Sequence, residues 1–137
     1  MIVRQVQGDI FDAEQEHIAF AANKEGSNSE GFAGQVSSRI WPELYNTGKK
    51  ELGEVLTHKD GDKTFYALVC HSVFHNGWSG TPRWVRKCLD QIDVPTDTEI
   101  AVVLMGSGPV GRGNGADVAA IINAMEKSRQ RIVVYTL

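Results

Sequence analysis

The segment from Ile100 to Met125 constrains the fold of this chain more than any other. Its first part, Ile100–Leu104, is an uninterrupted apolar run, which is typical of a strand buried on both faces. A loop with five glycines between positions 106 and 115 follows. Apolar residues then recur at i, i+3, i+4 and i+7, the spacing of an amphipathic helix: Val118, Ile121, Ile122 and Met125. A strand, a glycine-rich loop and a helix in this order point free backbone N–H groups at an anion.

The glycine-rich loop has two interpretations. Without side chains, its backbone N–H groups could approach a phosphate closely. It is not a Walker A motif, because no Gly-Lys-Ser/Thr follows, and it lies too late in the chain for the dinucleotide-binding fingerprint. The alternative is a connection that binds nothing, and the composition of the loop leaves both interpretations open.

Length and composition limit the class of protein. A chain of 137 residues suits one domain, residues 1–137, with a core of its own. The formal net charge of −3 gives no basic field for nucleic acid, and no apolar run is long enough to span a membrane. Cys70 and Cys88 are interpreted as reduced, buried side chains rather than a disulfide or a metal pair. We expect an intracellular, cytoplasmic protein without a metal or a cofactor.

The first quarter of the chain predicts two strands. Residues 2–7 alternate apolar and polar side chains, as expected of a half-exposed edge strand. Asp9 follows them, and it either caps a short helical turn around residues 13–16 or keeps its carboxylate for a ligand. A short apolar strand over residues 17–22 then ends at Asn23.

A second glycine-rich loop, residues 24–34, leads into a helix. Pro42 must end or kink this helix, whose apolar face carries Val36, Ile40 and Leu44. Gly31 and Gly34 flank its start, so this loop could also hold a phosphate at a helix N-terminus.

The rest of the chain completes an α/β pattern. The Asp-Gly pair at positions 60 and 61 predicts a hairpin between residues 53–59 and 64–73. Thr81-Pro82 is a helix start, and the final strand covers residues 131–137. Helices on both faces of a mixed central sheet predict a three-layer α/β/α sandwich.

Both glycine-rich loops should open at the carboxyl edge of the sheet, where open α/β sheets bind ligands. Two such loops facing one crevice suit a diphosphate better than a single phosphate. Asp9 could accept a hydrogen bond from an exocyclic amine, and Asn23 could bond a sugar hydroxyl.

Together these segments resemble a macro domain. The resemblance rests on Gly8-Asp9-Ile10, Ala21-Ala22-Asn23, Gly31-Phe32-Ala33-Gly34 and the loop from Gly106 to Gly111, and it covers nearly the whole chain. It is greatest to the subgroup of terminal ADP-ribose glycohydrolases and fungal ADP-ribose-1″-phosphate phosphatases, which end in a strand similar to residues 134–137.

The resemblance implies ADP-ribose or a derivative as the ligand. It places Asp9 at the adenine amine with the Ile10 backbone beside it, and Asn23 at the distal ribose. The diphosphate would be held by backbone N–H groups of two segments, in which every residue except Pro109 carries one: Gly31, Phe32, Ala33 and Gly34, and Ser107, Gly108, Pro109, Val110 and Gly111.

The resemblance supplies no complete catalytic set. The glycohydrolases use a strand-end lysine and a loop aspartate, but this chain has Cys70 and His71 at the strand end and Pro109-Val110-Gly111 in the loop. The phosphatases use a histidine just before the asparagine, where this chain reads Phe20-Ala21-Ala22. Asn23 and His71 remain as candidates, although a histidine on an apolar strand is more often structural.

Two functional hypotheses follow. In the first, the chain binds ADP-ribose or a derivative, either ADP-ribose-1″-phosphate or an ADP-ribosyl group on a protein. It hydrolyses the derivative slowly, as a phosphatase or in de-ADP-ribosylation. In the second, it is a non-catalytic reader or sequesterer of ADP-ribose. A third alternative is an RNA-binding module, against which the acidic balance argues.

Overall fold

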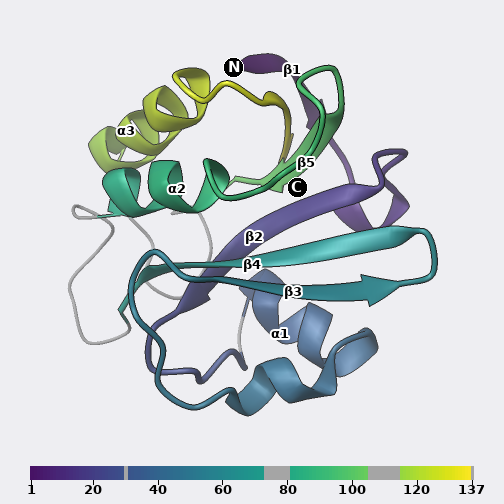
Figure 1. Cartoon of the computed structure of the whole chain (residues 1–137), viewed down its shortest axis with the longest axis vertical. Coiled ribbons are helices and arrows are strands. Elements are labelled where there is room, and N and C mark those ends of the chain that lie inside the picture. The colour runs from purple at the N-terminus through teal and green to yellow at the C-terminus, as the bar shows by residue number, and fades with distance from the viewer. Residues whose placement is uncertain (30, 73–80, 105–114, 137) are drawn as a thin grey trace.

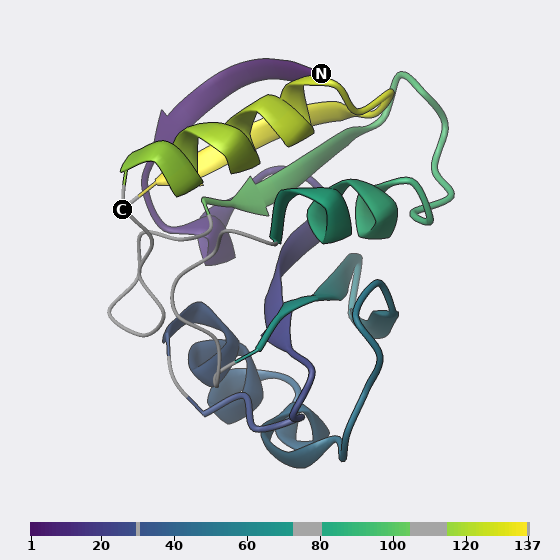
Figure 2. The same cartoon turned by 90° about the vertical axis from the view of Figure 1, so that its left-hand side faces the viewer.

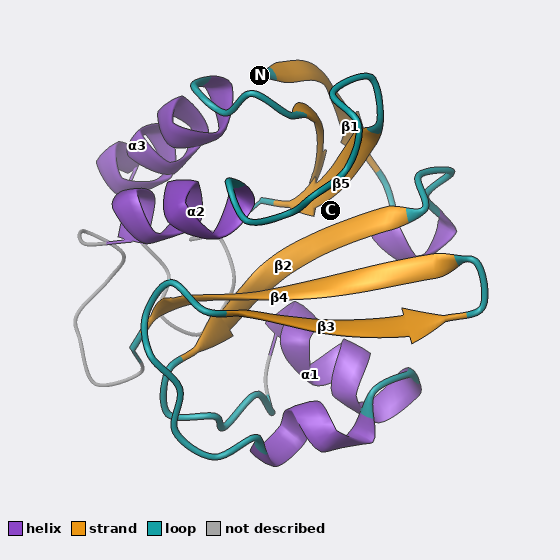
Figure 3. Ribbon diagram, viewed as in Figure 1, coloured by secondary structure: helices purple, strands orange, loops and turns teal. Residues whose placement is uncertain are grey.

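A computed structural model describes residues 1–29, 31–72, 81–104 and 115–136. These residues form a mixed six-stranded sheet of order β1-β6-β5-β2-β4-β3 (Figures 1 and 3). All neighbouring strands are parallel except β3 and β4, which form an antiparallel pair. The strands are β1 (Ile2–Gln7), β2 (His17–Asn23), β3 (Val55–Asp60), β4 (Lys63–His71), β5 (Glu99–Val103) and β6 (Arg131–Thr136).

Helices cover both faces of this sheet. One face carries α1 (Gly31–Arg39) with the short 3-10 helix η2 (Pro42–Asn46), and the other carries α2 (Thr81–Leu89) and α3 (Gly115–Glu126) (Figures 1 and 2). The predicted order of elements and the three-layer α/β/α sandwich are therefore confirmed. None of the helices in the described ranges is long and apolar enough to cross a membrane.

The central strands contribute alternate residues to two separate cores. On β2, Phe20 packs toward α1 and Ala19 packs toward α2 and α3. On β5, Ala101 faces the first core, whereas Ile100 and Val102 face the second. Because both faces are covered, the interior positions of these strands, residues 18–22 and 100–103, are continuous apolar runs.

The hairpin and the end of α1 form as predicted. Asp60 pairs with Lys63, and Gly61 at the first central position of the turn has φ +61°. A glycine with positive φ at this position, followed by a residue with negative φ, fits a type II′ turn. The helix α1 ends at Arg39, and Pro42 begins η2 instead of continuing it.

The short helical turn after β1 is displaced from its predicted position. We expected it around residues 13–16, but the 3-10 helix η1 covers Ile10–Asp12. The apolar side chain of Ile10 is buried, which draws the turn forward into the core beneath α1. Gln15, within the expected turn, is buried in a hydrogen-bonded network with Glu99 and Tyr135 instead.

Candidate functional site

Two of the predicted ligand-binding residues, Asp9 and Asn23, lie at one edge of the sheet. The five parallel strands all end at this carboxyl edge, with Asn23 closing β2 and Asp9 two residues beyond β1. Strands β6 and β5 lie between β1 and β2, so three inter-strand spacings, about 14 Å, separate their ends. A ligand touching both ends of this row must be extended.

Asp9 caps η1 at one end of the row. Its Oδ1 accepts a hydrogen bond from the backbone N–H of Phe11 at 2.9 Å, and the side chain is exposed. The turn is fixed to the sheet because the Gly8 N–H donates to the Thr136 carbonyl at 2.8 Å. The capping interpretation is confirmed, and the exposed carboxylate stays compatible with a contact to a ligand.

An aromatic cluster holds the start of α1 against η1. The Phe32 ring lies 5.1 Å from that of Phe11 and 5.4 Å from that of Phe20, between ring centroids. The Arg39 guanidinium carbon lies 3.9 Å from the centroid of the Phe11 ring. Because its ring is used in this packing, Phe32 could serve a ligand only through its backbone, the role predicted for it.

The two glycines at the start of α1 have separate structural reasons. Gly31 has φ +61°, and a Cβ there would meet no described atom within 4 Å. A Cβ at Gly34 would lie 2.6 Å from the carbonyl oxygen of Ser29. Gly34 is therefore required by local packing whether or not a phosphate binds, and only the surroundings of Gly31 are open. Ala33, between them, is buried.

Asn23 organises the loop that follows β2. Its amide donates to the Ser27 carbonyl at 2.8 Å and accepts from the Ser27 N–H at 3.1 Å. Its own N–H donates to the side chain of Asn28, whose amide in turn reaches the Leu44 carbonyl. The Asn23 side-chain bonds use one amide N–H and one oxygen lone pair, half of what a primary amide offers.

Sequence reasoning missed a polar cluster beside Asn23. A register shift at the end of β2 pairs Asn23 with His71 of β4. Ser72 donates from Oγ to Oε2 of Glu25 at 2.7 Å. Burial lowers the pKa of His71 from 6.5 to about 4, against a smaller opposing effect of the Glu25 carboxylate. The sequence places Glu25 two residues after a strand-end asparagine, but its contact with Ser72 depends on how β2 and β4 pair.

The cysteines are buried and reduced, as predicted. Both thiols are free, Cys70 on β4 and Cys88 on α2, and both are fully shielded from solvent. Burial raises the pKa of Cys88 to about 12 and that of Cys70 well above its ordinary value. Neither is therefore a thiolate at neutral pH, which removes Cys70 as a nucleophile.

The second predicted phosphate loop lies outside the described residues. This applies to Ser107, Gly108, Pro109, Val110 and Gly111. The elements that flank the loop are present as predicted, since β5 ends at the carboxyl edge with Val103 and α3 begins at Gly115.

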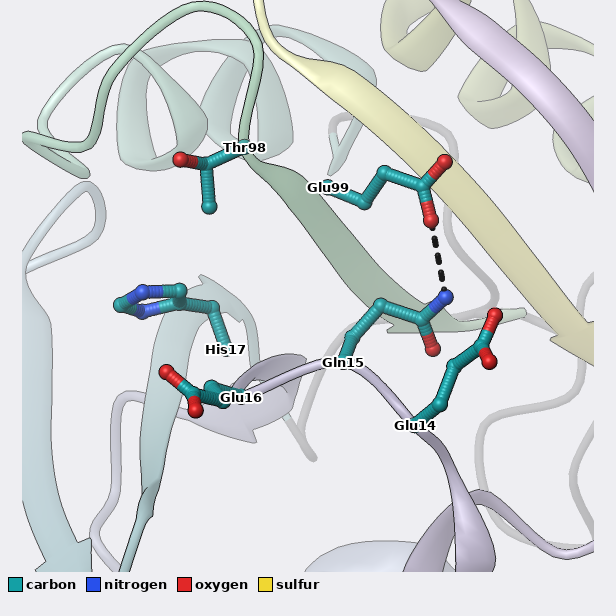
Figure 4. Close-up of a pocket in the computed structure, with 6 residues that line it drawn as sticks. All are labelled: Glu14, Gln15, Glu16, His17, Thr98 and Glu99. Carbon is teal, nitrogen blue, oxygen red and sulfur yellow. Dashed lines mark hydrogen bonds between the residues drawn. The ribbon is translucent and has the colours of Figure 1, made fainter.

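A separate hollow of about 310 Å³ lies at the opposite edge of the sheet, where β2 and β5 begin (Figure 4). Two of its three glutamates, Glu14 and Glu99, are engaged with neighbouring side chains. Glu99 accepts from Arg4 at 2.8 Å and from Gln15 at 3.0 Å. We assign it no ligand. The lining residues are Glu14, Gln15, Glu16, His17, Thr98 and Glu99.

The strand order, the helical layers and the row of loops at the carboxyl edge define a macrodomain fold. No family model matches the sequence, and no curated protein matches it. Solved structures do match. A macrodomain protein from Streptomyces coelicolor aligns with a TM-score of 0.71 at 16% identity, covering 100% of this chain and 99% of its own.

Two further matching structures include a ligand. A mutant macrodomain of Oceanobacillus iheyensis, described with ADPR, gives a TM-score of 0.70 at 18% identity, covering 96% of this chain and 82% of its own. Thermosipho africanus DarTG in complex with ADP-ribose gives 0.65 at 15% identity, covering 93% of this chain and 39% of its own. At these identities the likeness establishes the fold.

Proposed function

We propose that this chain binds ADP-ribose or a derivative along the carboxyl edge of its sheet. The observation that carries this proposal is the placement of Asp9 and Asn23 at the ends of β1 and β2, three strand spacings apart. That separation suits an extended ligand with a base at one end and a sugar at the other. The ligands named for the Oceanobacillus and Thermosipho structures support the same chemistry.

Each part of the ligand has a proposed contact. Asp9 accepts a hydrogen bond from the adenine amine, with the Ile10 backbone beside it. Asn23 bonds the distal ribose through the amide N–H and the oxygen lone pair that its loop does not use. Backbone N–H groups of residues 31–34, at the start of α1, hold the diphosphate together with those of residues 107–111 other than Pro109.

Any reaction at this site is hydrolysis by water, acting on ADP-ribose-1″-phosphate or an ADP-ribosyl group on a protein. A covalent intermediate with the distal ribose needs a nucleophile, but Cys70 and His71 replace the strand-end lysine. The buried Cys70 thiol is not ionised. These same observations favour the second candidate, a reader that binds ADP-ribose without turnover.

Discrimination between adenine and hypoxanthine tests the placement of the ligand. A carboxylate that accepts from the adenine amine faces a keto oxygen in inosine diphosphate ribose, which leaves a polar group unpaired at about 1–3 kcal/mol. Calorimetry should show tighter binding of ADP-ribose, and Asp9→Ala should remove the difference.

Asp12→Ala is the matched control, because Asp12 is an exposed carboxylate on the same 3-10 helix. This variant should keep the preference for adenine. Equal affinity of the unaltered protein for the two ligands would refute the role of Asp9, and failure to bind either would refute the proposed function.

A further inference from the structure

Glu25 lies at the carboxyl edge of the sheet, next to the proposed position of the distal ribose. It stands two residues beyond Asn23, and the Lys24 N–H between them donates to the His71 carbonyl at 2.9 Å. Ser72, which is buried, directs its hydroxyl at Oε2 of the Glu25 carboxylate at 2.7 Å. The half-buried side chain is thus fixed against the end of β4.

The backbone on both sides of Glu25 is also fixed. The Lys24 carbonyl accepts from the N–H of Lys50 at 2.8 Å, and the Gly26 carbonyl accepts from the N–H of Thr47 at 3.1 Å. Gly26 has φ +81°, and a Cβ on it would lie 2.1 Å from the Gly48 carbonyl oxygen. A side chain on a loop held this closely is positioned before any ligand binds.

Among the residues that the structure describes, the side chains next to Glu25 are poor proton acceptors. The Asn23 amide does not titrate near neutral pH, and the Cys70 thiol is closed off in the core. Burial keeps His71 uncharged and lowers its basicity, since its pKa is about 4. In the described part of the loop after β2, Glu25 is the carboxylate that lies at the carboxyl edge of the sheet beside Asn23.

We propose that Glu25 is the general base of a hydrolysis at C1″ of the distal ribose. The inference rests on the proposed function. The oxygen of a water molecule forms a bond to C1″ while the bond from C1″ to the 1″-oxygen breaks. The leaving phosphate keeps the electron pair of that bond. The proton of the water passes to the Glu25 carboxylate and then to solvent, while the Ser72 hydroxyl donates to Oε2.

The test compares binding with turnover in the whole chain. Glu25→Gln keeps the shape of the side chain and an oxygen for Ser72, but it is not a base. It should bind ADP-ribose within about twofold of the unaltered protein and should release phosphate from ADP-ribose-1″-phosphate about 100-fold or more slowly. Glu51→Gln, an exposed glutamate of the neighbouring segment, is the matched control and should change neither quantity.

Chemical rescue separates a base from a structural residue. Formate should restore part of the turnover of Glu25→Ala, since a small carboxylate can occupy the space and accept the proton. In water enriched in oxygen-18, the released phosphate should carry no label, because attack is at carbon.

Four outcomes would overturn the inference while ADP-ribose binding persists. They are full activity of Glu25→Gln, absence of any turnover by the unaltered protein, failure of formate to restore Glu25→Ala, and label in the phosphate. Loss of ADP-ribose binding by Glu25→Gln would instead make Glu25 a binding residue and also overturn it. Failure of the unaltered protein to bind ADP-ribose would refute the proposed function itself.

Discussion

The buried imidazole of His71 should make the stability of this protein fall in mild acid. The unfolded chain takes up a proton on His71 near the ordinary pKa of 6.5, whereas the folded protein does so only near 4. Between these pH values the unfolded state binds more protons, so the free energy of unfolding falls as pH falls from about 6.5 toward 4. Above pH 7 both states are neutral and the histidine has no effect on the pH dependence.

The size of the effect follows from the two pKa values. The full shift corresponds to about 3 kcal/mol at the acid limit, of which about 2 kcal/mol is already lost at pH 5. That is a large fraction of the 5–15 kcal/mol stability typical of a domain. Urea unfolding measured between pH 5 and pH 8 would resolve it.

Replacing His71 separates its contribution to the pH dependence of the free energy of unfolding from the contribution of the carboxylates. Between pH 7.5 and pH 5, the free energy of unfolding of His71→Gln should fall by about 2 kcal/mol less than that of the unaltered protein. This difference does not depend on how stable the variant is at neutral pH. An unchanged slope in His71→Gln would show that the histidine is not held neutral by burial.

Two further predictions concern the loops. Gly108→Val places a branched side chain in the predicted diphosphate loop, so it should abolish ADP-ribose binding in calorimetry while thermal unfolding stays unchanged; a folded variant of full affinity would refute the placement. Asn28→Ala removes a buried amide that bonds the Asn23 N–H and the Leu44 carbonyl, so it should lower the free energy of unfolding by about 2–4 kcal/mol. An equilibrium urea titration showing less than about 1 kcal/mol would mean that water replaces both bonds.

Local patterns predicted the fold well because its elements are determined locally. Apolar runs such as residues 100–103 identify strands covered on both faces, Pro42 ends a helix by its missing N–H, and the glycine at position 61 supplies the positive φ of the hairpin turn. The turn after β1 was placed too late because burial of Ile10, a tertiary contact, starts it directly after its cap, Asp9.

The candidate site was only partly predictable, because its contacts are tertiary. Asp9, Asn23 and the start of α1 could be placed at one edge, since strand ends of a parallel sheet share an edge. The cluster of Glu25, His71 and Ser72 depends on a register shift between β2 and β4, which no spacing in the sequence encodes. The bonds that engage the Asn23 amide are equally invisible in the sequence.

The strand order has a consequence for how the protein is made. Asp9 and Asn23 are close in sequence, but the two strands that separate them come from the last third of the chain. The strand β1 is bonded to β6 within the sheet, and Ile2 pairs with Ile132. During synthesis β1 can therefore pair only after β6 has been made. The pairing of these two strands has a high contact order. A nascent chain that contains β1 and β2 already contains Asp9 and Asn23. Until β5 and β6 lie between these strands, the two residues are not at the spacing that a ligand needs.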